Sequence, residues 1–388
     1  MRIFVLGAGA TGSLLAQLLE RQGHTVWCGD KNVERARRFL AKKSAIRVEA
    51  VNARNLWAIV RAGRGCHLLV NASPAVFNEI ILRAALRLRA HYLDLGSHLT
   101  RHPFKAEQLR FNRRFVQKNR AALINAGVAP GLTNLLVKRS ARLLDAVEAV
   151  HIRLYESTES KDPISTWSAD VSFDEATSRP RVYRHGRFRL ARRFSEPERF
   201  RFPPPIGEVT TMLAAQDEVG TLPHFLAMRE MDVKIGGNEI ERLRRWYRQG
   251  RLRAARKPVS KRFPQTPTPR LVAQLIRQGK LHNARFALAV LVRGRRGDQP
   301  LMVRWDASFL TLYQIRRRGM LTTPIAYATA HMAALFVKHF PRDRAGVFPP
   351  EDLPHDTCVA ILRELRSRDV SLRLRITRLK RTEEEEEF

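Results

Sequence analysis

The sequence predicts an α/β protein, with an N-terminal doubly wound parallel sheet followed by a second α+β domain built on a mixed or antiparallel sheet. The first thirty residues read as strand, glycine loop, helix and strand. Apolar runs then alternate with helical patterns as far as about residue 125, and the alternation stops at residues 129–131. Such alternation favours parallel strands covered by helices. At about 150 residues per domain, a chain of 388 residues makes two or three domains.

The elements of the first domain follow from short apolar runs and helical spacing. Residues 2–6 (RIFVL) predict the first strand, and the leucines between residues 11 and 21 recur at helical spacing. Gly23 ends that helix before a second strand at residues 25–28. Further strands are predicted at 46–48, 67–70, 92–95 and 122–125, with helices at 75–88 and 105–118. We assign residues 1–130 to this domain.

The second domain is predicted over residues 131–321. It begins with a helix at about 133–145 and continues with strands at 149–155, 181–185 and 287–292, joined by polar and proline-containing loops. Amphipathic helices at 325–336 and 357–366 and a short strand at 370–374 follow. We expect this last part, about 322–376, to return to the first domain. Residues 382–388 form an acidic tail, which as a block of like charges should be disordered.

The charge is strongly basic, with 70 Lys+Arg against 37 Asp+Glu and a formal net charge of +33. A basic face can bind a polyanion by releasing counterions. However, the 57 Arg and 13 Lys are spread over nearly every segment, which favours compositional drift over a dedicated nucleic-acid surface. The densest run, residues 242–262, carries no nucleic-acid-binding motif. Nucleic acid is therefore not the expected partner.

The compartment is predicted from cysteines and hydropathy. Cys28, Cys66 and Cys358 have neither the spacing of a zinc site nor that of a disulfide framework, which indicates a reducing environment. The most apolar stretch, residues 324–337, is too short and too polar to cross a bilayer. No apolar signal region precedes the first strand. We expect a cytoplasmic protein without a membrane span.

The loop after the first strand is the motif with the clearest chemistry. It reads Gly7-Ala8-Gly9-Ala10-Thr11-Gly12 and fits G-x-G-x-x-G between a strand and a helix. Gly7 allows the tight turn, Gly9 lets a pyrophosphate approach the backbone, and Gly12 brings helix and strand together. Ala10 and Thr11 open the helix, whose free N–H groups favour phosphate. The loop predicts a dinucleotide-binding (Rossmann) domain, the alternative being a tight turn in a cofactor-free sheet.

Polar residues at the ends of other strands extend this predicted site. Asp30 ends the second strand, where a carboxylate accepts ribose hydroxyls and repels a 2′-phosphate, so we expect NAD. Lys31 and Arg35 could neutralise a 2′-phosphate, which keeps NADP open. Asn71, Ser73 and Pro74 follow the fourth strand, where open parallel sheets place ligands, although a plain turn is equally compatible.

Several longer segments resemble the saccharopine dehydrogenase family, including its lysine-dehydrogenase-like members. They are HYLDLGS at residues 91–97, NAGVAPGLTNL at 125–135, WSADVSFDEATSRPRVYRHG at 167–186, DEVGTLPHFL at 217–226 and GVFPPEDL at 346–353. The similarity runs from Met1 to about Leu374 in the family's order. It implies a nicotinamide-dependent oxidoreductase acting on a carbon–nitrogen bond of an amino acid. It also implies a Rossmann domain and an α+β domain that mediates a homodimer.

The sequence departs from the family pattern at two places. Asn52 stands where the family often has an aspartate near the adenine, although its amide can still form hydrogen bonds. Gly96 follows Leu95 where several members carry a hydroxyl, and Ser97 comes one place later. The second departure concerns the shape of the catalytic pocket.

Candidate catalytic and substrate-binding groups lie at strand and helix ends. Asp94 ends an apolar strand near the expected nicotinamide, where burial could raise its pKa for acid–base work; the alternative is a carboxylate that caps the next turn. Thr133 and Asn134 open a helix and could hold a substrate carboxylate or the cofactor amide, or serve only as N-caps. Further candidates are Asp170 and Glu175 for a substrate ammonium and Lys234 for proton transfer, although each could be merely solvated. No histidine spacing indicates a metal.

Together these features predict an oxidoreductase that moves a hydride between a nicotinamide and the carbon of a C–N bond. Two alternatives stay open: a dinucleotide-binding regulatory protein without turnover, and a basic polyanion-binding protein on a Rossmann scaffold.

Overall fold

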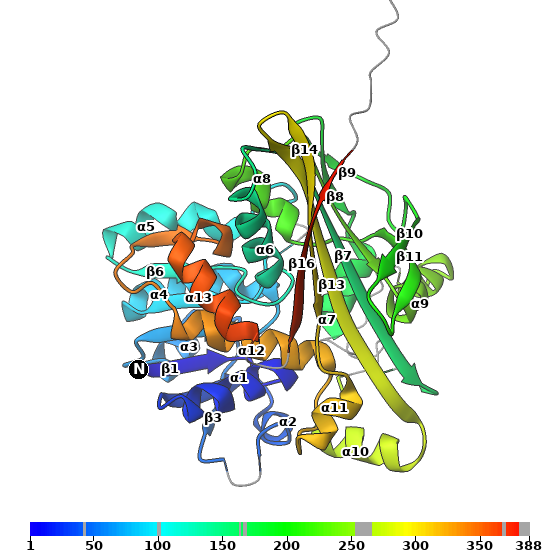
Figure 1. Ribbon diagram of the computed structural model, residues 1–388. Coiled ribbons are helices and arrows are strands. Elements are labelled where there is room, and N and C mark those ends of the chain that lie inside the picture. Colours follow the sequence, from blue (N-terminus) through cyan, green and yellow to red (C-terminus); the bar gives the residue numbers. More distant parts are fainter. Residues whose placement is uncertain are drawn as a thin grey trace, which may run out of the picture.

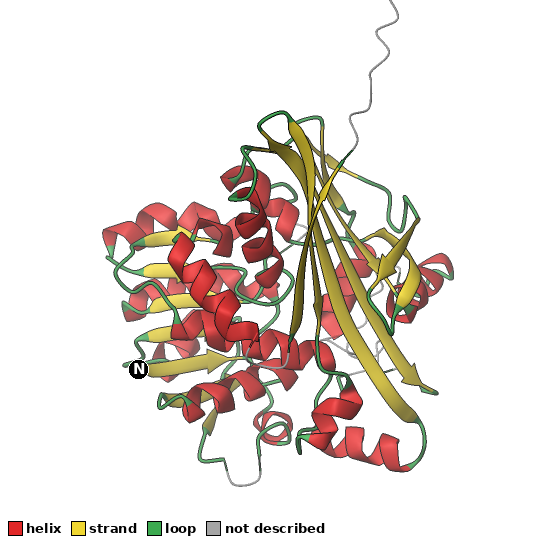
Figure 2. Ribbon diagram, in the orientation of Figure 1, coloured by secondary structure: helices red, strands yellow, loops and turns green. Residues whose placement is uncertain are grey.

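The computed structural model describes residues 1–41, 44–98, 102–162, 164–165, 169–252, 266–366 and 370–379; the side chains of residues 169 and 170 are not among them. It contains two sheets with helices packed around and between them (Figures 1 and 2). The predicted α/β class, with a parallel sheet and a second mixed sheet, is confirmed. Within the predicted acidic tail, all of residues 382–388 lie outside the described residues.

The first sheet is parallel throughout. Its order is β15-β6-β5-β4-β1-β2-β3, so the direction of winding reverses between β1 and β4. In chain order the strands are β1 (Arg2–Leu6), β2 (Thr25–Asp30), β3 (Arg47–Ala50), β4 (Leu68–Asn71), β5 (His91–Asp94), β6 (Ala121–Leu123) and β15 (Gly346–Phe348). Because open parallel sheets bind ligands at their carboxyl ends near such a reversal, this edge is where a site is expected.

Helices cover both faces of this sheet. They are α1 (Ala10–Arg21), α2 (Val33–Arg37), α3 (Leu56–Ala62), α4 (Asn78–Leu88) and α5 (Asn112–Gln117), with 3₁₀ turns at Ala75–Phe77 and Glu107–Phe111. Side chains alternate along β1, so Ile3 and Val5 join one apolar core, and Phe4 and Leu6 join the other. Burial on both faces explains why β1 reads as a continuous apolar run.

The second sheet has nine strands and is mixed. Its order is β10-β11-β12-β7-β13-β14-β16, with the hairpin β8–β9 attached to β12. The strands are β7 (Ala146–Ser160), β8 (Arg181–Arg184), β9 (Arg187–Leu190), β10 (Glu198–Phe202), β11 (Gly207–Leu213), β12 (Glu230–Gly236), β13 (Leu281–Arg296), β14 (Gln299–Ser308) and β16 (Ser371–Arg378). Only the pair β12–β7 is parallel among the strand pairs of the described residues.

The remaining helices join the two sheets into one molecule. They are α6 (Leu132–Ala141), α7 (Ala169–Thr177), α8 (Leu222–Phe225), α9 (Asn238–Arg248), α10 (Pro269–Arg277), α11 (Leu312–Arg317), α12 (Pro324–Lys338) and α13 (His355–Arg366), with 3₁₀ turns at Glu218–Gly220 and Pro350–Asp352. Helix α12 is almost entirely buried, and it packs against α1 on one side and β13 on the other. A single apolar core therefore runs from the first sheet through α6 and α12 to the second sheet.

The last strand differs from the prediction. Residues 346–348 do pair with β6 in the first sheet, but β16 pairs with β14 at the edge of the second sheet. The pair of Leu372 and Ala307 fits this position, because Leu372 packs against the shared apolar core, whereas Leu374, opposite Trp305, is 41% exposed.

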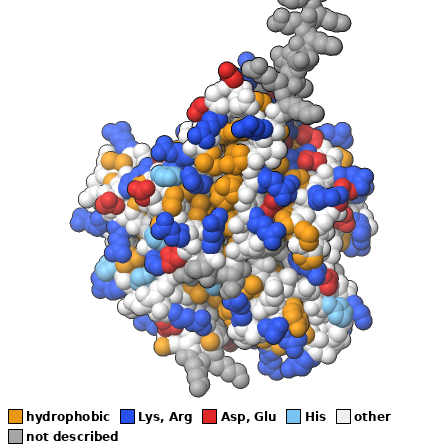
Figure 3. All heavy atoms as spheres, viewed as in Figure 1, with side chains coloured by type: hydrophobic (Ala, Val, Ile, Leu, Met, Phe, Trp, Pro, Cys, Tyr) orange, Lys and Arg blue, Asp and Glu red, His pale blue; other side chains and the backbone are white. Residues whose placement is uncertain are grey.

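The basic side chains form no single patch on the face shown in Figure 3, where Lys and Arg are scattered among other residues. Of the densest basic run, residues 242–248 belong to α9, whereas residues 253–262 lie outside the described residues. No helix in the described segments is long and apolar enough to span a membrane.

Candidate functional site

The glycine loop adopts a turn that two of its glycines make possible. Gly7 has a φ of +97°, and a Cβ there would lie 2.6 Å from the backbone of Ala72 in the loop after β4. A Cβ on Gly12 would lie 1.9 Å from the carbonyl oxygen of Gly7. Both glycines are therefore required by the packing of the protein itself.

Gly9 differs from these two glycines, because a Cβ there would meet no protein atom within 4 Å. Its φ of −78° suits any residue, so the fold does not demand glycine at this position. Gly9 is the N-cap of α1, and no side chain caps this helix end. Ala10 and Thr11 in the first turn are partly exposed. Open space beside free N–H groups at a helix N-terminus fits a pyrophosphate.

Asp30 lies beside this loop at the end of β2. Its Oδ2 accepts a hydrogen bond from the Ala8 N–H at 2.9 Å, and its Oδ1 accepts one from the Asn32 N–H at 2.9 Å. The carboxylate is half-buried and ties the glycine loop to the second strand. Each oxygen keeps a further lone pair, so ribose hydroxyls can still be accepted.

The groups that could read a 2′-phosphate lie nearby. Lys31 is exposed, and the Arg35 guanidinium lies over the Phe39 ring, 5.1 Å from its centroid. Asn52 follows β3 at the same sheet edge, is exposed, and accepts a hydrogen bond from the Arg54 N–H at 3.0 Å. The structure thus brings the predicted nucleotide residues to one edge, around the ends of β1, β2 and β3.

The side chain of Asn71 is buried and fully engaged, which agrees with the plain turn that was one of the two alternatives for this segment. Its Oδ1 accepts hydrogen bonds from the Ser73 N–H and hydroxyl at 2.9 and 2.6 Å, and its Nδ2 donates to Asn78 Oδ1 at 2.8 Å. Asn71 therefore shapes the turn through Ser73 and Pro74, which are partly exposed. Its hydrogen bonds stabilise the loop after β4, which packs against Gly7.

Asp94 is a buried carboxyl with 1% of its surface exposed. Its Oδ1 accepts from the Asn125 N–H at 2.7 Å and its Oδ2 from Gln108 Nε2 at 3.0 Å. Burial raises its pKa from 3.8 to about 7, although these hydrogen bonds oppose the rise. A side chain closed off in this way cannot touch a substrate, so the geometry supports the turn-capping interpretation and not the catalytic one.

Thr133 and Asn134 are likewise fully buried, and each donates a hydrogen bond to a buried glutamate. The Thr133 hydroxyl donates to Glu218 Oε1 at 2.9 Å, and Asn134 Nδ2 donates to Glu351 Oε2 at 2.9 Å. Asn134 Oδ1 also accepts from the Gly131 N–H at 2.9 Å. Burial raises the pKa of Glu218, and it raises that of Glu351 to about 7. Thr133 and Asn134 thus connect the start of α6, through hydrogen bonds, to the 3₁₀ turns at Glu218–Gly220 and Pro350–Asp352.

Arg181 on β8 is a buried cation that the sequence did not single out. Its Nη2 donates to the His98 carbonyl at 3.3 Å, and its Nη1 lies 3.9 Å from Asp217 Oδ1. Asp217 Oδ2 in turn accepts from the Ser97 N–H at 2.8 Å. Burial raises the pKa of Asp217 well above its usual range, although the neighbouring guanidinium opposes this. Arg181 thus connects the second domain to the chain that follows β5.

A seam of buried polar groups therefore lies at the carboxyl ends of β5 and β6. Several of its buried atoms have no hydrogen-bond partner: Asn125 Nδ2, Arg181 Nε, Asp217 Oδ1, Glu218 Oε2 and Glu351 Oε1. Buried polar atoms usually have partners, so a seam with this many open positions indicates bound water or a polar ligand. Glu218, Glu351 and Arg181 all belong to the segments that carried the family resemblance, which was the signal that could have found them.

The other predicted substrate residues are spread over the second domain. Glu175 in α7 is partly buried and accepts from Gln216 Nε2 at 2.7 Å; burial, and then the charge of Glu156, raise its pKa well above the usual range. Asp170 also belongs to α7, but its side chain lies outside the described residues. Lys234 is bound to Glu198 Oε2 at 2.8 Å in a buried ionic network with Arg153.

The structure does not bring Lys234 to the other candidate residues. Its neighbours on β12, Val233 and Ile235, face the shared apolar core, so Lys234 points to the opposite face of the second sheet.

Fold and site together define an α/β protein in which a doubly wound parallel sheet has the features of a dinucleotide-binding (Rossmann) fold. Comparison with known proteins adds to this class. Residues 3–129 match the saccharopine dehydrogenase NADP binding domain. The predicted resemblance is confirmed over these residues, and the match supports NAD or NADP as the cofactor.

The chain is similar to several solved structures, of which the first described here shows the shared fold. Saccharopine dehydrogenase (L-Glu forming) from Saccharomyces cerevisiae superposes with a TM-score of 0.69 at 11% identity, covering 98% of this chain and 100% of the yeast one. An engineered D-amino acid dehydrogenase bound to NADP+ gives a TM-score of 0.45 at 10% identity, covering 95% and 99% of the two chains. A meso-DAPDH variant from Clostridium tetani gives 0.41 at 10% identity, covering 92% and 95%.

Proposed function

We propose that the protein is an NAD(P)-dependent oxidoreductase that acts on a carbon–nitrogen bond of an amino acid, oxidising an amine to an imine or running in reverse. The observation that carries the proposal is the open space at Gly9, beside the uncapped N-terminus of α1, in a domain that matches the family. The nicotinamide cofactor supplies the hydride acceptor or donor. The residues of the chain bind, orient and enclose the reactants.

The nucleotide half of the site is assigned to the ends of β1, β2 and β3. In the proposal the N–H groups of Ala10 and Thr11 hold the pyrophosphate, and Asp30 accepts the ribose hydroxyls. The negative charge of Asp30 favours NAD, whereas Lys31 and Arg35 are the groups that would read a 2′-phosphate. The name of the matching domain supports NADP as the alternative.

The substrate half is assigned to the seam at β5 and β6 and to α7. Glu175 is the carboxylate that we assign to the substrate ammonium, because it is only partly buried while Glu156 and Asp217 add negative charge around it. Burial, and then the charges of Glu156 and Asp217, raise the pKa of Glu175, and a bound cation would favour its charged form against both effects. Asp94, Thr133 and Asn134 hold the walls of this half through the bonds described above.

The test is turnover. Purified protein is incubated with NAD+ or NADP+ and a panel of amino acids, and the absorbance of the reduced nicotinamide is followed. The reverse reaction is assayed with NADH or NADPH, a 2-oxo acid and an amine. Formation or consumption of reduced nicotinamide that depends on both substrates supports the proposal.

Two results would favour the alternatives. Tight NADH binding without turnover on any pair of substrates would contradict the proposal and favour a regulatory protein. If the protein binds no nucleotide but is retained on an anionic column until the salt concentration is raised, the polyanion-binding alternative suggested by the charge of +33 would be favoured.

The assembly and compartment belong to the same proposal. We place the enzyme in the cytoplasm as a homodimer, as the family resemblance and the three free, buried cysteines suggest. Light scattering of the purified protein and fractionation of cells that express it test the two statements.

A further inference from the structure

A pocket of about 250 Å³ lies between α10, α11 and the turn that follows α11, at the edge of the second domain. Its lining residues are Ala273, Ile276, Arg277, Arg316, Gly319 and Leu321. This volume is slightly below the usual range for drug-sized ligands and suits a small metabolite. None of these residues belongs to the nucleotide half or the substrate half described above.

The walls of the pocket are fixed by a small apolar core of their own. Val272 and Leu275 of α10 and Leu312 of α11 are buried together with Leu281 at the start of β13. Thr268 caps α10 by accepting from the Leu271 N–H, and Thr311 caps α11. The packing holds the backbones of the two helices in place, with the exposed Arg277 on one side of the pocket and the exposed Arg316 on the other.

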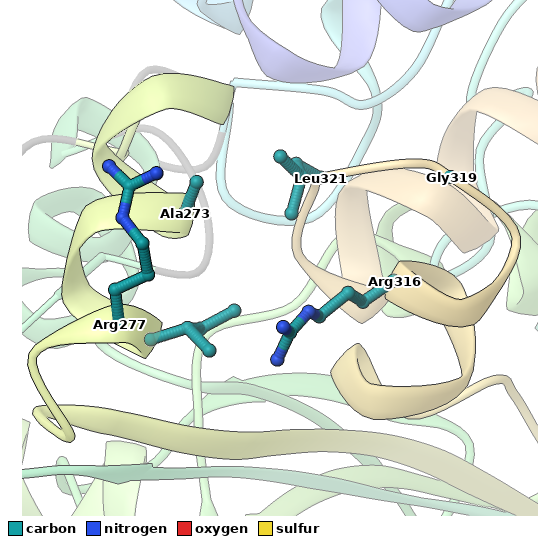
Figure 4. A pocket seen from close by; sticks show the side chains of 6 residues that line it. Ala273, Arg277, Arg316, Gly319 and Leu321 are labelled. Atoms are coloured by element: carbon teal, nitrogen blue, oxygen red, sulfur yellow. The ribbon is translucent and has the colours of Figure 1, made fainter.

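The chemistry of the lining is two cations separated by apolar surface. In Figure 4, Arg277 lies on the wall formed by α10 beside Ala273, whereas Arg316 and Leu321 reach in from the opposite wall. Within the segments that the structure describes, neither guanidinium has an ion pair or a hydrogen bond to the protein. Many other arginines, such as Arg184 and Arg304, have carboxylate partners.

We propose that this pocket binds an aliphatic dicarboxylate, with one carboxylate on Arg277, the other on Arg316, and the methylene chain against Ala273, Ile276 and Leu321. A guanidinium binds carboxylate through paired N–H donors, and the apolar wall between the two cations matches a spacer without charge. A ligand with one anionic end would leave one guanidinium without a partner. The inference does not rest on the proposed oxidoreductase activity.

The experiment is isothermal titration of the whole chain with succinate, glutarate and adipate, and with pentanoate as the monocarboxylate of matched length. We expect one dicarboxylate to bind best and pentanoate to bind at least about tenfold more weakly, which is the scale of one lost charged hydrogen bond. Arg277→Met and Arg316→Met should each weaken the best dicarboxylate by about tenfold or more. Arg317→Met is the control, because Arg317 is exposed on α11 and does not line the pocket.

Two results would overturn the inference. One is the absence of dicarboxylate binding to the wild type. The other is an equal loss of binding in all three variants, which would mean attraction to the net positive charge and no built site. Repeating the titration with saturating NADH shows whether the ligand belongs to the reaction, in which case the nucleotide changes its affinity, or binds independently. Titration of Gly9→Val separates this site from the nucleotide site, since the pocket should bind dicarboxylate unchanged there.

Discussion

Replacing Asp94 by asparagine removes a carboxyl whose pKa burial raises from 3.8 to about 7. Because the folded state holds this proton more tightly than the unfolded state, the contribution of Asp94 to stability is fully present below pH 4 and is lost as the pH rises to about 7. The difference corresponds to about 4 kcal/mol, since each pKa unit is worth about 1.36 kcal/mol. Asparagine does not titrate, so the variant should lack this part of the pH dependence.

The assay is chemical denaturation of wild type and Asp94→Asn at several pH values between 4 and 8, on the assumption of two-state unfolding. The free energy of unfolding of the wild type should fall by about 4 kcal/mol more than that of the variant across this range. Turnover of the folded variant should stay close to that of the wild type, because both carboxyl oxygens of Asp94 are engaged by Asn125 and Gln108.

One pattern would refute this reasoning. It is a loss of turnover of about one hundredfold, the usual scale for an acid–base group, together with a pH dependence of stability like that of the wild type. Asp94 would then act on the reacting atoms, as the strand-end position first suggested.

Three further predictions concern other carboxyls of the site. Asp30→Ser should weaken NAD and improve NADP relative to it, because the charge that repels a 2′-phosphate is gone; nucleotide titrations check this, and a wild type that already prefers NADP would assign the choice to Lys31 and Arg35. Burial raises the pKa of Glu351 from 4.5 to about 7, so between about pH 4.5 and 7 the free energy of unfolding of the wild type should fall by about 3 kcal/mol more than that of Glu351→Gln; an unchanged pH profile of unfolding would contradict it. Glu175→Gln should raise KM for the amino acid about tenfold or more, the scale of a lost charged hydrogen bond, and leave NADH affinity unchanged; equal effects on both would place Glu175 outside the substrate half.

The first domain was predictable because its strands are buried on both faces and its turns need particular residues. The run at residues 2–6 is apolar throughout, and Gly7 and Gly12 stand where the packing admits no Cβ. In this domain the local sequence and the tertiary packing therefore favour the same strands and turns.

The second domain was harder to predict because its strands carry arginine. In β9 (RFRL) and β10 (ERFRF) charged residues alternate with phenylalanine and leucine, and in β12 the buried Asp232 and Lys234 interrupt the apolar run. These charges are balanced by partners on other strands, such as Arg153 on β7, which only the assembled sheet brings near. Strands were predicted within β7, β8, β13 and β16, whereas β9, β10, β11, β12 and β14 were not predicted.

The roles of the site residues were less predictable than their positions. Asn71, Asp94 and Asn134 lie at the expected strand and helix ends, but their side chains turn inward to buried partners. Asn71 donates to Asn78, Asp94 accepts from Asn125 and Gln108, and Asn134 donates to Glu351. Periodicity and spacing do not show such pairings, because only the folded chain brings the partners together.

In the proposed complex a dinucleotide lies against Gly9, and the variant Gly9→Val shows whether it does. The side chain has room within the protein, since a Cβ at Gly9 meets no atom within 4 Å, so the melting temperature should stay that of the wild type. Gly12→Ala is the contrasting variant, because its Cβ would lie 1.9 Å from the Gly7 carbonyl oxygen and should lower stability. Titration by NADH fluorescence should show that Gly9→Val has lost nucleotide binding while it melts normally. Undiminished NADH and NADPH affinity in that variant would contradict the account.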